Sequence, residues 1–191
     1  QTPWLSDWSS DVCSSDLSID DFLLVKQSRL VIGKLQDAVR IESPIECNLA
    51  YRRVLQSCGI NRISPRVRQR LDQLVDRSGI RLVRHGERIF LWRSDQDPQQ
   101  PVDWRTAADD QGRRQAEELP PEEVASLARE ILQQQIGLPR ADLVRVCAKS
   151  LGYAQLGSTL EQTIRSGIDL AVQMSWIRQG NNGHDNLTSV L

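Results

Sequence analysis

Residues 62–73 hold a dense set of side chains that could bind nucleic acid. Arginine presents a planar guanidinium that donates in pairs to phosphate oxygens or guanine edges, and glutamine pairs with adenine. The candidates are Arg62, Arg66, Gln69, Arg70 and Gln73. This set predicts a surface that binds phosphates and reads base edges. The alternative is a solvated arginine face that pairs with Asp72 and Asp76.

The spacing of apolar residues predicts that these side chains stand on the outer face of a helix. Ser64 and Pro65 mark its start, because serine caps free backbone amides and proline at the first helical position loses no hydrogen bond. The apolar residues after this start recur at the spacing of one helical face: Val67, Leu71, Leu74 and Val75. At about 100° per residue, the far side carries Arg66, Gln69, Arg70, Gln73 and Arg77.

Two short β-rich runs come after this helix and predict a hairpin. Residues 80–84 and 88–92 flank the turn signal His85-Gly86-Glu87. A basic helix with a hairpin after it is the second half of a winged helix-turn-helix, in which the second helix of the motif enters the major groove. The wing adds three candidates for contact with the minor groove or the backbone, although His85 also fits a plain turn residue: Arg84, His85 and Arg88.

The order of predicted elements occurs twice along the chain. Helical patterns over residues 20–42 and 48–58 precede the basic helix, and a second series of helices and a hairpin begins near residue 122. With an offset of 93 residues, Gly59 aligns with Gly152 at the turn before the third helix. In the first helix Leu30 is expected to join the apolar stripe. In the second copy the third helix is expected over residues 158–168, and Trp176 is expected to replace Leu82 on the inward side of the hairpin.

The predicted fold class is therefore mainly α with small β-hairpins, organised as two tandem winged helix-turn-helix modules. The modules are expected over residues 20–93 and 122–191, joined by an acidic linker rich in proline and glutamine over residues 94–121. Trp104 in the linker is expected to anchor it to a neighbouring surface. A single helical domain that includes the linker is the alternative.

The distribution of charge supports a nucleic-acid contact by the first module. The whole chain has a formal charge of −1, but residues 45–93 hold 11 arginines against 4 acidic residues, whereas residues 94–126 hold 3 basic residues against 9 acidic ones. A local excess of positive charge is the usual electrostatic footprint of nucleic-acid binding. An arginine-rich surface without a ligand is the alternative.

Composition and motifs exclude several other classes of function. With 39% hydrophobic and 26% charged residues and no long apolar run, the sequence is typical of a globular protein without a membrane span. The four cysteines form no CxxC pair, and the two histidines fall in predicted turns. We therefore expect no metal site, no cofactor and no disulfide, and we expect a cytoplasmic location. No GxxxxGK[ST] loop is present, and no covalent chemistry or small-molecule substrate is expected of this chain.

Two stretches resemble a known bacterial domain. They read SPIECNLAYRRVLQSCGINRISPRVRQRL and LPPEEVASLAREILQQQIGLPRADLVRVCAKSLGYAQLGSTL, and the similarity covers about residues 30–180. The resemblance is to a poorly characterised domain at the C-terminus of large superfamily-one DNA helicases. It implies a parent chain that also holds an ATPase motor and a Vsr-like nuclease domain, which would be partners of this region in DNA repair or defence. Gln155 departs from the pattern, in which second copies carry an arginine.

Residues 1–17 differ in character from the rest of the chain, since they are rich in serine and aspartate and show no clear period. They include WSSDVCSSDL, which resembles a translated sequencing adaptor, and they lack the charged start and apolar core of a signal peptide. We therefore expect a non-native leader on a fragment of a longer protein.

The predicted function is auxiliary nucleic-acid binding that positions duplex or forked DNA for a helicase motor elsewhere in the parent chain. The second copy is expected to serve packing or protein contact, because its third helix is close to neutral, with Thr159, Glu161, Gln162, Thr163 and Arg165. The main alternative is a protein-interaction or dimerisation module in which the acidic linker covers the basic helix. A free-standing transcriptional regulator is a third hypothesis.

Overall fold

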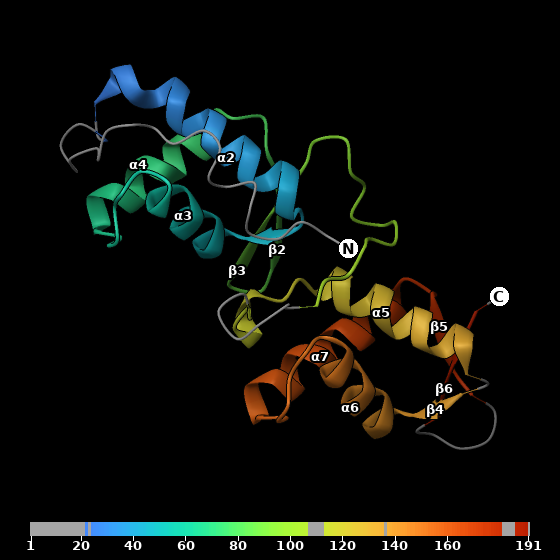
Figure 1. Cartoon of the computed structure of the whole chain (residues 1–191). Coiled ribbons are helices and arrows are strands. Elements are labelled where there is room, and N and C mark those ends of the chain that lie inside the picture. Colours follow the sequence, from blue (N-terminus) through green and yellow to red (C-terminus); the bar gives the residue numbers. More distant parts are fainter. Residues whose placement is uncertain (1–21, 23, 107–112, 136, 181–185, 191) are drawn as a thin grey trace. The chain divides into compact units, whose positions relative to one another are not determined.

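The structure is a computed structural model that describes residues 22, 24–106, 113–135, 137–180 and 186–190 (Figure 1). The chain divides into two compact units, Gln1–Gln96 (unit 1) and Asp97–Leu191 (unit 2). The described residues of each unit form three α-helices and one small three-stranded antiparallel sheet. This confirms the coarse prediction of a mainly helical chain with small β-hairpins. The predicted leader over residues 1–17 lies outside the described residues.

Unit 1 begins, within the described part, with a short 3-10 helix and continues with three helices and three strands. These are η2 Val25–Gln27, α2 Ser28–Glu42, β1 Ile45–Glu46, α3 Cys47–Gln56, α4 Pro65–Val75, β2 Arg81–His85 and β3 Arg88–Trp92. The sheet order is β1-β3-β2, with Ile45 opposite Leu91 and Val83 opposite Phe90. Ile45 and Leu91 belong to the core that α2, α3 and α4 form with this sheet.

The basic helix α4 forms for the reasons that its sequence predicts. The Ser64 hydroxyl accepts a hydrogen bond from the Val67 amide at 3.3 Å, and Pro65 is the first helical residue. The four residues of the expected apolar face are all buried: Val67, Leu71, Leu74 and Val75. After the helix, Gly79 has a positive φ of 73°, a conformation that favours glycine.

Two predicted core positions of unit 1 are wrong. Leu30 is 37% exposed, and Val31 takes its place in the core, because Val31 and Leu35 are four residues apart on the face that α2 buries. Leu82 is 39% exposed, because β2 is an edge strand of the sheet. Within the expected range 20–42, the described residues form the 3-10 helix η2 Val25–Gln27 and then the α-helix α2 Ser28–Glu42.

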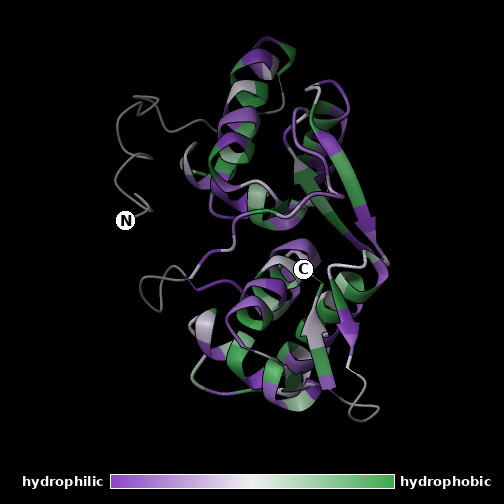
Figure 2. Cartoon of the chain, turned by 90° about the vertical axis from the view of Figure 1, so that its right-hand side faces the viewer, coloured by the Kyte–Doolittle hydropathy of each residue, from purple (hydrophilic) through white to green (hydrophobic). Residues whose placement is uncertain are grey.

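Unit 2 repeats this order of elements. They are η3 Ala116–Glu118, α5 Pro121–Gln134, β4 Leu138–Pro139, α6 Arg140–Ser150, α7 Ser158–Gln173, β5 Ile177–Gln179 and β6 Asn186–Ser189, with the sheet order β4-β6-β5. Ser28 and Pro121, the first residues of α2 and α5, are 93 positions apart, as are the first residues of β1 and β4. The helices of both units have apolar and polar sides (Figure 2).

The turn before the third helix is built in the same way in both units. Gly59 and Gly152 have φ values of 74° and 88°. In each case the residue after the glycine donates its amide to a carbonyl five positions earlier, at 2.9 Å in unit 1 and 3.0 Å in unit 2. This is the Schellman type of helix end, in which a glycine adopts a left-handed conformation. The duplicated turn therefore ends the second helix of each unit.

The third helix of unit 2 is longer than the sequence predicts. The expected range is 158–168, but α7 ends at Gln173. Gly167 lies within α7, and a β-carbon at this position would overlap Val124 of α5, so a glycine is what lets the two helices approach closely. Trp176 is half-buried against the core of unit 2 just before β5.

Most of the predicted linker belongs to unit 2. The boundary between the units falls after Gln96, whereas the predicted linker covers residues 94–121. The Val102 amide donates to the Ser126 hydroxyl at 2.9 Å, and the Trp104 indole packs against the core of unit 2 and donates to Glu130 at 2.6 Å. The segment is therefore fastened to the surface of unit 2 over the residues that the structure describes.

Candidate nucleic-acid interface

Helix α4 is held in place by polar contacts with α3. The Tyr51 hydroxyl donates to Asp72 Oδ1 at 2.7 Å, and burial raises the pKa of Tyr51 well above its usual value, so the hydroxyl stays a donor. On the same side, the Arg68 guanidinium donates to the Asn48 side chain, which in turn donates to Glu46 Oε1 at 2.8 Å. These contacts fix the angle at which α4 presents its outer face.

Four of the five candidates on or near α4 lie exposed on its outer side. Arg62, Arg66, Gln69 and Gln73 form no hydrogen bond or ion pair with any residue that the structure describes. The expected alternative partners do not reach them, since Asp72 accepts from Tyr51 and no ion pair joins Asp76 to an arginine among the described residues. Their hydrogen-bonding groups are therefore open to a ligand.

Arg70 is placed differently from the prediction. It lies three residues after Val67 and four before Leu74, and so flanks the apolar stripe rather than opposing it. Its side chain is half-buried, and Nη2 donates to the Ser28 hydroxyl at the start of α2 at 2.6 Å. Arg70 thus ties α4 to α2, and the exposed charge of this face comes from the other arginines.

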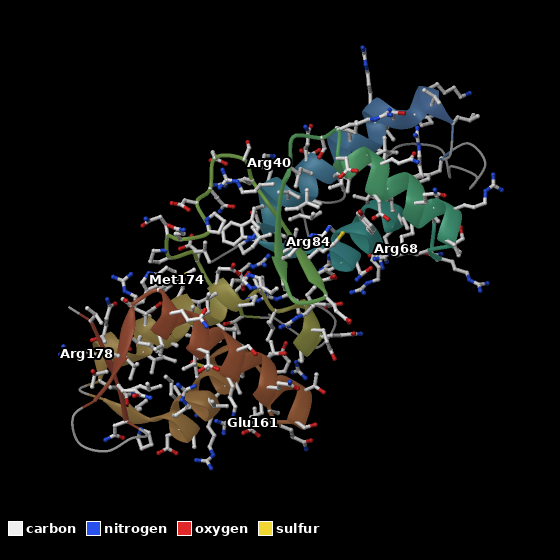
Figure 3. All side chains as sticks on the ribbon, turned by 180° about the vertical axis from the view of Figure 1, so that it is seen from behind. Arg40, Arg68, Arg84, Glu161, Met174 and Arg178 are labelled. Atoms are coloured by element: carbon white, nitrogen blue, oxygen red, sulfur yellow. The ribbon has the colours of Figure 1, made fainter. Side chains whose placement is uncertain are left out.

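The wing candidates divide into one free charge and two that are held. Arg84 on β2 is exposed and makes no hydrogen bond or ion pair with the described residues; it is labelled in Figure 3 together with Arg68 of α4. His85 and Arg88 pair across the turn and both lie against Phe90. The His85 ring meets Phe90 edge-on with centroids 5.9 Å apart, and the Arg88 guanidinium lies 6.0 Å from the Phe90 centroid.

Two further arginines stand near the candidates. Arg68 is exposed, but its guanidinium donates to Asn48 of α3. Arg77, which the helical spacing already places on the far side of α4, is exposed just after the helix, and its side chain has no partner among the described residues. Helical periodicity alone does not identify Arg68 as a candidate, because Arg68 lies on the side of α4 that faces α3. Arg53 belongs elsewhere, since its Nε lies 3.2 Å from the buried Glu42 carboxylate.

In unit 2 three of the four arginines of the described α-helices, all but Arg129 of α5, pair with carboxylates. On α7, Arg165 Nη2 lies 2.8 Å from Glu161, one turn earlier. Arg145 Nη1 lies 2.6 Å from Asp142 on α6. An ion pair also joins Arg140 to Asp169 of α7. The third helix of unit 2 therefore offers little free positive charge, in keeping with its near-neutral sequence.

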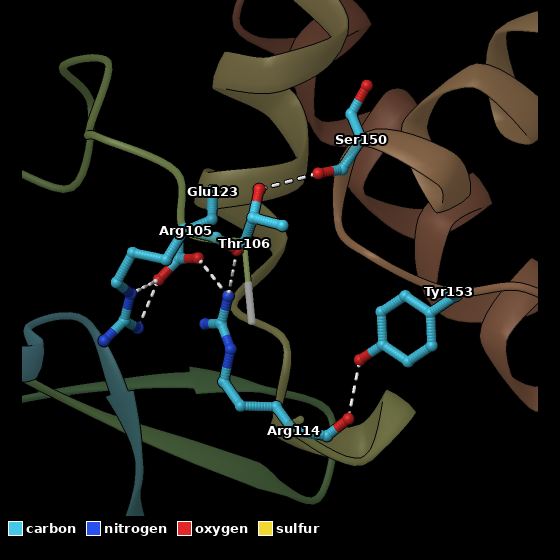
Figure 4. Close-up of polar contacts among 6 residues, drawn as sticks. All are labelled: Arg105, Thr106, Arg114, Glu123, Ser150 and Tyr153. Carbon is cyan, nitrogen blue, oxygen red and sulfur yellow. Dashed lines mark hydrogen bonds and ion pairs between the residues drawn. The ribbon is translucent and has the colours of Figure 1, made fainter. Parts of the chain in front are cut away.

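A buried carboxylate in unit 2 binds two arginines of the segment predicted as a linker (Figure 4). Glu123, in the first turn of α5, is fully buried; Arg105 Nε lies 2.9 Å from its Oε1 and Arg114 Nη2 lies 2.8 Å from its Oε2. The Thr106 hydroxyl donates to the Ser150 carbonyl at 2.7 Å, and the Tyr153 hydroxyl donates to the Arg114 carbonyl at 2.6 Å. These contacts hold the segment on unit 2, so the group has a structural role.

Metal and thiol chemistry find no support in the described residues. No three histidine, cysteine, aspartate or glutamate side chains gather there in a way that could hold a metal ion. Burial raises the pKa of the Cys47 thiol to about 11 and that of Cys147 to about 12, so both stay protonated at neutral pH and are poor nucleophiles.

The chain matches no protein-family model, no curated protein and no solved structure. The resemblance to a helicase C-terminal domain therefore stays a prediction. Among the helices of the described residues, none combines the length and the apolar composition that a bilayer crossing requires.

Proposed function

We propose that unit 1 is a winged helix-turn-helix that binds nucleic acid, and that unit 2 is a second winged helix with a packing or protein-contact role. The order of three helices and a hairpin with a three-stranded sheet supports this fold for each unit. The observation that carries the function is the set of exposed arginines without carboxylate partners among the described residues, on α4, close to its two ends and on the hairpin: Arg62, Arg66, Arg77 and Arg84.

The proposed binding mode places α4 in the major groove of a duplex and the β2–β3 hairpin against the backbone. Helix α4 has 11 residues and is about 16 Å long, and its diameter with side chains, about 10–12 Å, matches the width of the major groove, about 12 Å. Phosphate contacts by the exposed arginines supply most of the affinity, which makes binding strongly dependent on salt. Arg84 extends the contact from the helix to the wing.

The proposed setting is an ATP-dependent DNA helicase of the cytoplasm, in which this region positions duplex or forked DNA for the motor. The support is the sequence resemblance over about residues 30–180 together with the basic face of unit 1. The motor and nuclease domains of such a parent chain are the proposed partners. The chemistry of unwinding belongs to the motor, and the role of unit 1 is to bind.

A protein-interaction role is the second candidate, and it has an observation of its own. Leu30 and Ile41 are 11 residues apart on α2, which is three helical turns, so they lie on one side of the helix; they are 37% and 38% exposed. Exposed apolar side chains on one side of a helix are available for contact with another protein. Self-association that depends on protein concentration, together with indifference to DNA, would favour this second function.

The test is fluorescence anisotropy of the full chain with a labelled forked duplex at several salt concentrations. The variant Arg66→Ala/Arg84→Ala removes two free charges from unit 1. The control Arg145→Ala/Arg178→Ala removes two positive charges from unit 2, of which Arg145 is paired with Asp142. We expect the first variant to bind more weakly and to lower the slope of log affinity against log salt by about 2, since each lost phosphate contact contributes about 0.9. Equal binding by both variants, or no salt-sensitive binding at all, would reject the proposal.

A further inference from the structure

Two glutamines stand side by side on the outer face of α4. Gln69 and Gln73 are four residues apart, which places them one above the other on the helix. Both are exposed, and neither forms a hydrogen bond with any described residue. Each therefore presents a free amide, with one acceptor and two donor hydrogens, in the same direction.

The charges along α4 give this face an orientation. Arg66 stands in its first turn, three residues before Gln69, and Arg62 precedes the helix. The carboxylates Asp72 and Asp76 belong to the later half of the helix and its end. A phosphate backbone is therefore attracted most strongly to the first half, and Arg77 follows the end of the helix. The two glutamines follow Arg66 along the outer face, about one and two helical turns after it.

The equivalent positions of unit 2 do not carry a pair of glutamines after an arginine. Gln162 lies 93 residues after Gln69, but the position after Gln73 by the same offset is Ser166, whose hydroxyl donates to the Gln162 backbone carbonyl at 3.0 Å. Thr159 stands where unit 1 has Arg66. The pair of free amides therefore occurs only in the copy whose third helix also carries free arginines.

We propose that Gln69 and Gln73 read base edges in the major groove and make unit 1 selective for duplex DNA that presents adenine at one or two positions. An adenine offers N7 as an acceptor and its N6 amino group as a donor, and the amide of glutamine matches both. The inference rests on the proposed function, since the arginines must first hold the backbone. The inference also goes beyond that function, because contacts with phosphates carry no sequence information.

The experiment is selection from a library of duplexes with a randomised segment of about one helical turn, with sequencing of the bound fraction. The full chain, Gln69→Ala/Gln73→Ala and the control Gln162→Ala are compared; alanine keeps the helix, and the exposed control removes the same group from unit 2. We expect the full chain and the control to enrich A·T pairs at one or two positions. The enrichment should be about 5-fold or more, because this factor corresponds to the weakest discrimination expected from one bidentate contact between a side chain and a base. The double variant should lose this enrichment and keep the salt slope, because no charge is removed.

The outcomes separate this inference from the proposed function. Salt-sensitive binding without enrichment, or enrichment that survives in Gln69→Ala/Gln73→Ala, overturns the reading of bases and leaves backbone binding intact. Enrichment of G·C pairs that persists in this variant also overturns it and points to arginine as the reader. Absence of salt-sensitive binding by the full chain overturns both.

Discussion

Two helical glycines of the chain are expected to respond to alanine in opposite directions. Gly33 lies within α2, and a β-carbon there would meet nothing within 4 Å. Gly167 lies within α7, and a β-carbon there would lie 2.5 Å from Cγ1 of Val124, closer still to its Cβ, and 3.0 Å from the Pro121 carbonyl oxygen. The chemical change is the same at both positions, so the difference measures the approach of α5 to α7.

Helix propensity and steric overlap set the expected changes in the free energy of unfolding. Alanine is favoured over glycine in a helix interior by about 1 kcal/mol, so Gly33→Ala should stabilise unit 1 by about that amount. Carbon atoms in contact prefer about 3.5–4.0 Å, and the obstacles at Gly167 are a β-branched side chain and backbone, which cannot turn away. Overpacking of this kind costs about 3 kcal/mol at the upper end, so Gly167→Ala should destabilise unit 2 by about 2 kcal/mol after the gain in propensity.

Hydrogen exchange of backbone amides measures both effects in the full chain, because it reports the opening of each unit separately. Core amides of α7 should exchange roughly 30-fold faster in Gly167→Ala, since about 1.4 kcal/mol corresponds to a factor of ten. Those of α2 should exchange more slowly in Gly33→Ala. Combining Gly167→Ala with Val124→Ala should cost less than the sum of the two single changes, because the second removes the obstacle. Stabilisation by Gly167→Ala alone would refute the close approach of α5 and α7.

Two further predictions concern buried polar groups. Glu123→Gln leaves Arg105 and Arg114 without their counter-charge and should destabilise unit 2 by about 3 kcal/mol, with faster hydrogen exchange over residues 97–106. The control Glu117→Gln changes an exposed carboxylate and should have little effect. Equal effects of the two variants would contradict the role of Glu123 in fastening the segment. Because burial raises the pKa of Cys47 and Cys147 from 9.0 to about 11 and 12, the unfolded chain releases these protons first, and the free energy of unfolding should fall as pH rises above about 9. Cys47→Ala/Cys147→Ala should flatten this fall in urea titrations, and an unchanged slope would refute it.

Local signals predicted the parts of the fold that short-range physics controls. The start of α4 is set by Ser64 and Pro65, and its buried face by a spacing that any helix must respect. The turn at Gly59 and its copy at Gly152 could be predicted in the same way, because a positive φ selects glycine. None of these features depends on which other element lies nearby.

The errors arose where a distant partner decides the outcome. Leu30 and Val31 are equally apolar, and only the position of the other helices selects Val31 for the core. Arg70 is as basic as Arg66, but the start of α2 takes it as a partner. Gly167 lies inside the expected helix, and only the packing of α5 shows why this position is a glycine. Such choices belong to tertiary contacts, which a single sequence does not display.

The candidate interface illustrates the same limit in its electrostatics. A count of arginines does not separate the third helix of unit 1 from ion-paired surfaces, since an arginine paired with a carboxylate offers little to a phosphate. What distinguishes α4 is where its acids lie: Asp72 is engaged by Tyr51, and Arg66 is left without a carboxylate in reach among the described residues. On α7 the equivalent helix places Glu161 one turn before Arg165 and neutralises it. One arrangement of helices can therefore present free positive charge or a neutral face on its third helix, depending on where a single carboxylate is placed.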